Sequence, residues 1–226
     1  MFNDNTLCAP QVSSVWLRVM HTAILTFQGF NELDSLIALG VLNRIKKPGW
    51  RVTVCCPDDE VTSMNGVTIR AQTSLEDAAE ADAVIVGSGM QTRDIVKNPE
   101  IMQRLNLNPD RQLITSQCSG ALVLAKLDLL GDIPACTDLT TKPWVMEAGV
   151  EVLNQPFHAV QNIATAGGCL ASSYLAAWII ARAEGVEAAK EAIHYVAPVG
   201  QKESFVGHAL DMISPYLTNE SIAEPL

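Results

Sequence analysis

The fold is indicated by one stretch of sequence, Leu113-Ile-Thr-Ser-Gln-Cys118-Ser-Gly-Ala-Leu-Val-Leu124. Its first half has the composition of a buried strand, and its second half is an apolar helical pattern that begins after two small residues. A tight strand-to-helix turn would therefore hold Cys118. In a nucleophile elbow such a turn pushes a reactive side chain out above the sheet. The sequence predicts an elbow of this kind with cysteine in place of serine.

Strand and helix patterns alternate on both sides of this stretch. We expect strands at residues 22–27, 50–56, 83–86, 111–116 and 162–165, and helices at 33–41, 121–130, 170–183 and 188–194. Residues 64–72 contain Asn65-Gly66 and predict a small hairpin. This alternation indicates an α/β fold, with a mostly parallel sheet and helices on both faces. Cys118 would then lie at the carboxyl ends of the strands, where such sheets bind ligands.

A single domain accounts for the chain. It has 226 residues, 48% of them hydrophobic, and a mean hydropathy of +0.18, which suit one full-sized core. We expect this domain at residues 21–217. A loosely held extension is expected at 1–20 and a mobile tail at 218–226.

The charge and the hydropathy exclude several classes of partner. A net charge of −10 disfavours nucleic-acid binding, because a phosphate backbone is engaged by clustered Lys and Arg. No apolar run approaches the roughly 18–20 residues needed to span a bilayer. The first twenty residues also lack the basic start and apolar run of a signal peptide. We therefore expect a cytoplasmic protein that acts on a small molecule.

The cysteines form no recognisable framework. They are Cys8, Cys55, Cys56, Cys118, Cys136 and Cys169, and no two have C-x-x-C spacing. We therefore expect reduced thiols and no metal site. The turn Gly87-Ser88-Gly89 lacks the extended glycine fingerprint of dinucleotide sites, so no cofactor is expected.

Cys118 has two interpretations, a reactive thiol or a buried core residue. Buried packing is the usual fate of cysteine, but Gln117 before it and Ser119-Gly120 after it are polar or small and favour the reactive thiol. A helix N-terminus would also favour thiolate over thiol. Backbone N–H groups of Ser119 and of the Gly87-Ser88-Gly89 turn could form an oxyanion hole. A turn without any ligand is the alternative for those glycines.

Taken with other segments, this stretch makes the chain resemble the ThiJ/PfpI superfamily, the class I glutamine amidotransferase-like proteins. The resemblance covers about residues 21–195 and rests on Phe27-Gln-Gly-Phe-Asn-Glu-Leu-Asp34, Cys56-Pro-Asp58 with Ser74-Leu-Glu-Asp-Ala78, Ala83-Val-Ile-Val-Gly-Ser-Gly89, Ile114-Thr-Ser-Gln-Cys-Ser-Gly-Ala121 and Thr165-Ala-Gly-Gly168. It implies a flavodoxin-like three-layer sandwich and a homodimer.

The resemblance also implies an acidic partner for the cysteine on the first helix. Asp34 occupies the matching position, and Glu32 is the second choice. A protonated carboxyl would donate a hydrogen bond to the thiolate, whereas an ionised one would raise the thiol pKa. The alternative for Asp34 is a solvated acid in the first turn of a helix.

The chain departs from many relatives because it lacks their histidine. Where they carry one, this chain has Ala135-Cys-Thr-Asp138 after the elbow helix and Ser119 after the cysteine. We expect structural or solvated roles for His158 and His194, so peptidase activity is not expected. Asp138 is expected near the site. Cys169, after Gly167-Gly168, would be either a resolving thiol or a small packed residue.

Two functions follow from these residues. The first is a small-molecule hydratase, lyase or hydrolase with Cys118 as nucleophile and Asp34 as proton shuttle. The pairing of Asp34 with a hydroxyl residue after the cysteine is similar to the isocyanide-hydratase branch, where the thiol adds to the isocyanide carbon and water releases an N-formamide. The second is a redox sensor or ligand-binding protein without turnover. The ligand-binding half of a transcription regulator has less support, since the acidic charge disfavours DNA.

Overall fold

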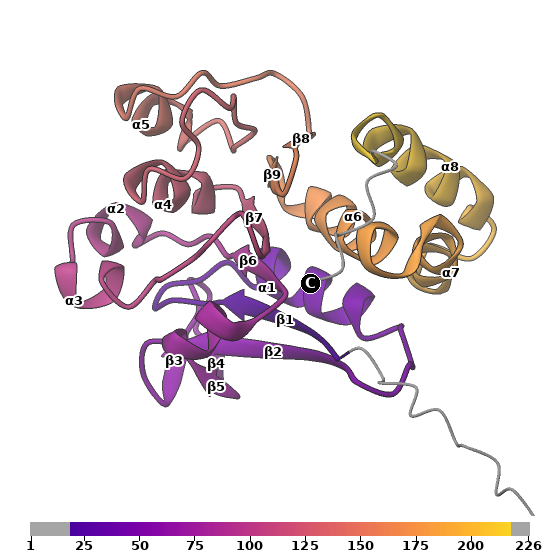
Figure 1. Cartoon of the computed structure of the whole chain (residues 1–226), viewed down its shortest axis with the longest axis horizontal. Coiled ribbons are helices and arrows are strands. Elements are labelled where there is room, and N and C mark those ends of the chain that lie inside the picture. The colour runs from indigo at the N-terminus through magenta and orange to yellow at the C-terminus, as the bar shows by residue number, and fades with distance from the viewer. Residues whose placement is uncertain (1–18, 218–226) are drawn as a thin grey trace, which may run out of the picture.

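The computed structural model describes residues 19–217 and shows a seven-stranded sheet surrounded by helices (Figure 1). The strand order is β5-β2-β1-β6-β7-β9-β8, and every ladder is parallel except that between β8 and β9. The strands are β1 (Met20–Leu25), β2 (Trp50–Cys56), β5 (Thr73–Ser74), β6 (Ala83–Val86), β7 (Leu113–Gln117), β8 (Phe157–Val160) and β9 (Ile163–Ala166). The expected α/β fold with a mostly parallel sheet is confirmed.

Helices cover both faces of this sheet (Figure 1). One core cluster joins the sheet to α1 (Glu32–Leu42), α6 (Ser172–Glu184), α7 (Val186–Val196) and α8 (Lys202–Ile213). The other joins it to α2 (Thr92–Ile95), α3 (Pro99–Met102), α4 (Gly120–Lys126) and α5 (Lys142–Glu147). Along β1, Ile24 belongs to the first cluster and Leu25 to the second, because successive strand residues point to opposite faces. Three short 3₁₀ segments, Leu75–Glu80, Cys169–Ala171 (η2) and Ser214–Tyr216, complete the helices.

The strand register places the ends of the central strands side by side. Val86 in β6 pairs with Ser116 in β7, and Ser116 pairs with Thr165 in β9. The residues that follow these positions therefore emerge at one edge of the sheet. Cys118 and the turn after Val86 both belong to this set.

Most sequence expectations agree with these elements, and the differences lie in short or weakly patterned segments. β2 and β6 have the expected bounds, and the hairpin forms with β3 (Glu60–Thr62) and β4 (Thr68–Arg70), so that it starts before residue 64. β1 begins at Met20, within the range expected for the extension. β5, β8, α5 and α8 were not expected. The rest of the proposed extension and the proposed tail lie outside the described residues.

Two further expectations concern membranes and thiols. Within residues 19–217, no helix is both long and apolar enough to cross a bilayer. The cysteines of this described part are all free, namely Cys55, Cys56, Cys118, Cys136 and Cys169.

Candidate active site

Cys118 lies at the tip of a tight turn between β7 and α4. Its φ of 45° is in the left-handed region, which costs energy for a residue with a side chain. The Cys118 N–H donates to the Ala166 carbonyl at 2.8 Å, and Thr137 Oγ1 donates to the Cys118 carbonyl at 2.8 Å. A Cβ on Gly120 would lie 2.2 Å from the Val86 carbonyl oxygen, so the close approach of α4 to β6 requires glycine. These contacts hold the turn that the sequence predicts.

Asp34 meets the cysteine from the first turn of α1. Asn31 caps this helix, because its side-chain oxygen accepts a hydrogen bond from the Leu33 N–H at 3.1 Å. The Asp34 side chain is fully buried. Ser88 Oγ donates a hydrogen bond to Asp34 Oδ2. A carboxylate oxygen of Asp34 and the sulfur atoms of Cys118 and Cys169 all lie within 4.8 Å of one another. Asp34 is therefore not a solvated helix-start acid.

Burial dominates the electrostatics of this group. It raises the pKa of Asp34, which the hydrogen bond from Ser88 partly offsets. It also raises the pKa of Cys118, to which the negative charge of Asp34 adds, while a hydrogen bond from Gln117 opposes it. The thiolate expected at a helix N-terminus is thus disfavoured, because Cys118 is only 4% exposed and faces an acid.

The acid and the thiol therefore titrate as a coupled pair. An aspartate ordinarily ionises some pH units below a cysteine, and ionised Asp34 then makes loss of the second proton harder. The first proton to leave the pair therefore comes from Asp34, and the second, from Cys118, leaves less readily. The carboxylate is consequently placed to accept a proton from Cys118.

The matching family model is described as the DJ-1/PfpI family and covers residues 20–182. The chain belongs to the DJ-1/PfpI family. The ThiJ/PfpI resemblance is thereby confirmed. No curated protein matches the chain.

Several solved structures have the same fold. Drosophila melanogaster DJ-1beta is 21% identical with a TM-score of 0.69, over 79% of this chain and 98% of that one. A ThiJ/PfpI family protein from Pseudomonas syringae is 18% identical with a TM-score of 0.70, over 95% of both chains. An AraC family transcriptional regulator from Pseudomonas putida is 19% identical with a TM-score of 0.69, over 79% and 100%. At these identities the likeness establishes the flavodoxin-like fold.

The predicted oxyanion hole differs from what this DJ-1/PfpI chain shows. The Gly89 N–H donates to Ser119 Oγ at 3.1 Å, and Ser119 Oγ also bonds Thr92 Oγ1 at 2.7 Å. The Gly89 N–H is therefore already engaged, and so is the Gly87 N–H, which donates to the Leu25 carbonyl at 2.9 Å. Within residues 19–217, the backbone N–H groups of Ser119 and Gly120 have no hydrogen-bond acceptor, as is usual in the first turn of a helix. These two donors remain beside Cys118.

The two other predicted acids do not contact Cys118. Glu32 accepts from Ser63 Oγ, and from Asn65 Nδ2 at 2.9 Å, so it joins α1 to the β3–β4 hairpin and is not the acid of the site. Asp138 Oδ1 accepts from the N–H groups of Thr140 and Thr141, both at 2.9 Å. Its charge adds slightly to the effect of burial on the pKa of Asp34.

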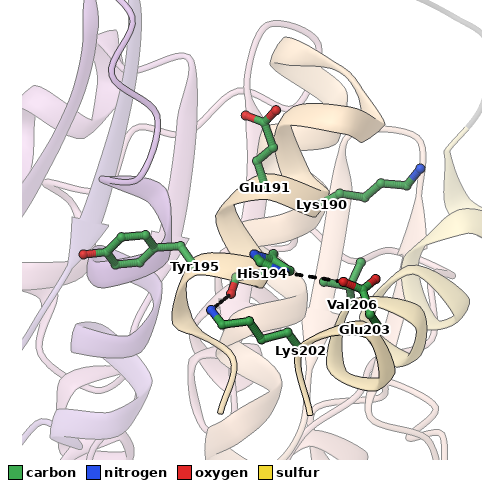
Figure 2. Close-up of a pocket in the computed structure, with 7 residues that line it drawn as sticks. All are labelled: Lys190, Glu191, His194, Tyr195, Lys202, Glu203 and Val206. Carbon is green, nitrogen blue, oxygen red and sulfur yellow. Dashed lines mark hydrogen bonds and ion pairs between the residues drawn. The ribbon is translucent and has the colours of Figure 1, made fainter. Parts of the chain in front are cut away.

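In the described part of the chain, no histidine contacts this cluster. His194 lines a shallow pocket between α7 and α8, where its Nε2 lies 3.6 Å from Glu203 Oε1 and its carbonyl accepts from Lys202 (Figure 2). The other histidines contact residues elsewhere: His21 bonds Thr53, His158 packs against Tyr216, and His208 packs against Tyr174. Asp34 is therefore the base nearest to Cys118 among these groups.

Two amides of the site were not predicted from the sequence. Gln117 Nε2 donates to Cys118 Sγ at 3.3 Å and to the Gly168 carbonyl at 2.8 Å. Asn31 Nδ2 donates to Cys169 Sγ at 3.2 Å. For Gln117 the available signal was a glutamine directly before the elbow cysteine, at the end of a strand predicted to be buried. The Asn31 contact had no such signal, because it joins segments that are distant in the sequence. Both amides orient a sulfur atom.

The cluster also has the composition of a metal-binding group. Asp34, Cys118 and Cys169 are the one set of three potential ligands that residues 19–217 bring together. Two sulfur atoms and an oxygen suit a soft or borderline cation. No C-x-x-C spacing marks these residues in the sequence, which is why no metal site was expected.

Proposed function

We propose that this DJ-1/PfpI protein is a cysteine-dependent enzyme acting on a small electrophilic substrate, by hydratase, lyase or hydrolase chemistry. The observation that carries this proposal is the buried Asp34 carboxyl within 4.8 Å of Cys118 Sγ. A nucleophile beside a base is the general arrangement for covalent catalysis. The strained elbow that presents Cys118 supports the same conclusion.

The proposed reaction begins with the neutral thiol and the ionised carboxyl. Cys118 Sγ attacks the electrophilic carbon while its proton passes to Asp34. The N–H groups of Ser119 and Gly120 face the atom that gains negative charge. Protonated Asp34 then returns the proton to the adduct. With an isocyanide, water next attacks the carbon of the adduct, again with Asp34 as base. One water proton goes to the nitrogen and the other to the Cys118 sulfur as the C–S bond breaks, which restores the thiol.

Substrates that need little help with a leaving group fit this site best. Expulsion of an amine requires a proton donor suited to neutral pH, usually histidine, and none of the described histidines contacts the cluster. Addition of the thiol to an isocyanide moves one proton, from sulfur to the isocyanide carbon, and expels no leaving group. Its thiol adduct is a thioimidate, and addition of water releases an N-formamide. Reactive aldehydes are the second class of candidate.

A screen of isocyanides and 2-oxoaldehydes tests the proposal. We expect wild-type turnover of at least one class, and a loss of about 10²–10⁴-fold in both Cys118→Ala and Asp34→Asn. Cys136→Ala is the matched control, because Cys136 is equally buried and lies outside the cluster. Full activity in Cys118→Ala would end the proposal.

The second candidate function is a cysteine-based redox sensor without turnover. Its support is that Cys118 and Cys169 lie together beside one acid, where an oxidised sulfur could accept hydrogen bonds. Mass spectrometry after mild peroxide treatment separates the cases. Oxidation confined to this site supports sensing, and oxidation spread over all six cysteines counts against it.

A homodimer in the cytoplasm completes the proposal. The supporting feature is an apolar groove of about 750 Å³ between α1, α6, α7 and α8. Three of its lining side chains are well exposed, namely Leu170 at 73%, Tyr195 at 66% and Phe205 at 49%. Contiguous exposed apolar surface is typical of interaction sites. The free thiols of the described residues agree with a reducing compartment.

A further inference from the structure

Cys169 is a second thiol at the site, and the proposed reaction with carbon electrophiles does not use it. It is the first residue of η2, directly after Gly167-Gly168. It is partly exposed, whereas Cys118 is only 4% exposed. Their sulfur atoms lie within 4.8 Å of each other. The pair thus comes from two separate loops at the same edge of the sheet.

Hydrogen bonds hold the two sulfur atoms in place. Gln117 Nε2 donates to Cys118 Sγ at 3.3 Å and to the Gly168 carbonyl at 2.8 Å, so one amide connects the two cysteine loops. Asn31 Nδ2 donates to Cys169 Sγ at 3.2 Å. Each sulfur atom therefore has its own donor, and the two loops are tied together.

Asp34 provides a base for both thiols. Its charge and its hydrogen bonding act on the pKa of Cys169 as well as on that of Cys118, although burial is the largest cause for each. Asp34 Oδ1 is buried and has no hydrogen-bond partner in the described part of the chain. A buried acceptor of this kind is costly unless a proton reaches it. Either thiol can supply that proton.

From this geometry we infer a further activity: the pair Cys118 and Cys169 reduces hydroperoxides through an intramolecular disulfide. Cys118 Sγ attacks one peroxide oxygen, the S–O bond forms and the O–O bond breaks. The thiol proton passes through Asp34 to the leaving oxygen, which departs as an alcohol or water. The peroxide is reduced by two electrons, and Cys118 becomes a sulfenic acid.

The second step uses Cys169. Its sulfur attacks Cys118 Sγ, the S–S bond forms and the S–O bond breaks. The proton of Cys169 passes through Asp34 to the leaving hydroxide, which departs as water. An external dithiol then reduces the disulfide, is itself oxidised, and restores both thiols.

Proximity favours the disulfide over further oxidation. Formation of a sulfinic acid requires a second peroxide to reach a buried sulfur, whereas Cys169 is already in place. The bond requires the sulfur atoms to approach to about 2.05 Å. Gly168, directly before Cys169, makes this movement feasible, because its φ is 90° and nothing lies within 4 Å of its Cβ position. Gly167 packs against the Thr137 carbonyl, so the movement is confined to Gly168 and Cys169.

The experiment is a titration of the reduced full chain with hydrogen peroxide, with a chelator present to prevent metal-catalysed oxidation. Thiols are counted after denaturation, and peptides are mapped without reduction. We expect one equivalent of peroxide to remove two thiols per chain and to yield a Cys118–Cys169 linked peptide. Dithiothreitol should reverse both changes. A Cys118 sulfinic acid beside an unmodified Cys169 would overturn the inference.

Three variants make the result specific. In Cys169→Ser we expect loss of the linked peptide and about tenfold more Cys118 sulfinic acid than in wild type. Cys136→Ser and Cys8→Ser should both give the wild-type result. Cys136 is fully buried with its pKa raised to about 12, and Cys8 lies outside the described residues. A linked peptide that contains Cys8 in place of Cys169 would contradict the inference.

The peroxide activity requires a reactive Cys118 but no carbon substrate. The experiments can therefore disprove it without disproving the proposed turnover of carbon electrophiles, and the reverse also holds. Turnover of isocyanides or aldehydes is measured on the same preparations in dithiothreitol. Turnover without the disulfide would overturn only the peroxide activity. A disulfide without turnover of any tested electrophile would leave the peroxide activity standing and count against the hydratase.

Discussion

At the scale of single residues, the chemistry depends on which of three neighbouring groups holds the negative charge. The ligand atoms of Asp34, Cys118 and Cys169 lie within 4.8 Å of one another, so ionisation of one group disfavours ionisation of the others. Burial raises the pKa of every member, and the Asp34 charge raises the pKa of both thiols further. In the proposed reaction the carboxylate is consequently the base, and its protonation would prevent Cys118 from acting as nucleophile.

Activity should therefore fall on the acid side through the pKa of Asp34. Because burial raises that pKa, the acid limb of kcat/KM should lie above the ordinary aspartate value of about 3.9. Glu32→Gln should keep both the activity and the limb, since Glu32 bonds the hairpin. The measurement is a pH–rate profile of wild type and Glu32→Gln. An acid limb that moves in Glu32→Gln would show that Asp34 is not the group that titrates.

Asp34→Asn should make the protein more stable at neutral pH while removing its activity. A carboxyl whose pKa is higher in the folded state than in the unfolded state favours folding at low pH, and that contribution is lost as the pH rises through the folded value. The amide avoids the buried charge and can still accept from Ser88. We expect a gain of roughly 1 kcal/mol at pH 7–8 and little change near pH 4. Urea unfolding at both pH values checks this, and equal effects at both would contradict it.

At the scale of elements, the elbow depends on the close approach of α4 to β6. In Gly120→Ala the new Cβ would meet the Val86 carbonyl oxygen at 2.2 Å, which only a backbone shift could relieve. We expect a loss of about 2–3 kcal/mol in the free energy of unfolding, together with loss of activity.

Gly207→Ala in α8 is the matched control, because nothing lies within 4 Å of its Cβ position. Removal of a glycine from the interior of an exposed helix should stabilise the protein by about 1 kcal/mol. Denaturant unfolding of both variants tests the comparison. A stable, fully active Gly120→Ala would show that the turn tolerates a larger separation between α4 and β6.

The elements that the sequence predicts well are those with strong local patterns. β6 is a continuous apolar run, and β2 is rich in β-branched and apolar residues; turn residues bound both, and their expected bounds agree with the structure. β8 has four residues and depends on its pairing with β9, and α5 has six residues fixed by packing of Val145. Neither element is long enough to show a strand or helix periodicity in the sequence. In α8 the buried positions Val206, Ala209 and Ile213 do have helical spacing, but small and polar neighbours weaken that signal.

At the scale of the whole molecule, the site is a product of sheet topology. Cys118 could be predicted from the strand and helix patterns on either side of it, and Asp34 was predicted from the family resemblance. The contact between Cys118 and Cys169 arises because β7 and β9 are parallel neighbours with aligned ends. The bond of Asn31 to Cys169 joins α1 to η2 across that edge. Such contacts depend on strand order, which no local pattern specifies.

Assembly is the remaining property at this scale. If the groove between α1, α6, α7 and α8 is the homodimer interface, Phe205→Glu should convert the dimer to monomers, because the charge would be buried against apolar residues. Leu139→Glu should have no effect, since Leu139 is 84% exposed and lies outside the groove. Light scattering coupled to size exclusion gives the mass. A dimer that persists in Phe205→Glu would place the interface elsewhere.

The central claim, that Asp34 holds the charge and acts as base for Cys118, is tested most directly by titration of the thiol. Thiolate absorbance near 240 nm is followed against pH for wild type and Asp34→Asn, with Cys118→Ala subtracted. We predict a wild-type midpoint above the ordinary value of about 8.5, and a lower midpoint in Asp34→Asn, where the repelling charge is gone. A wild-type midpoint well below that value, unchanged in Asp34→Asn, would place the charge on sulfur and contradict the account.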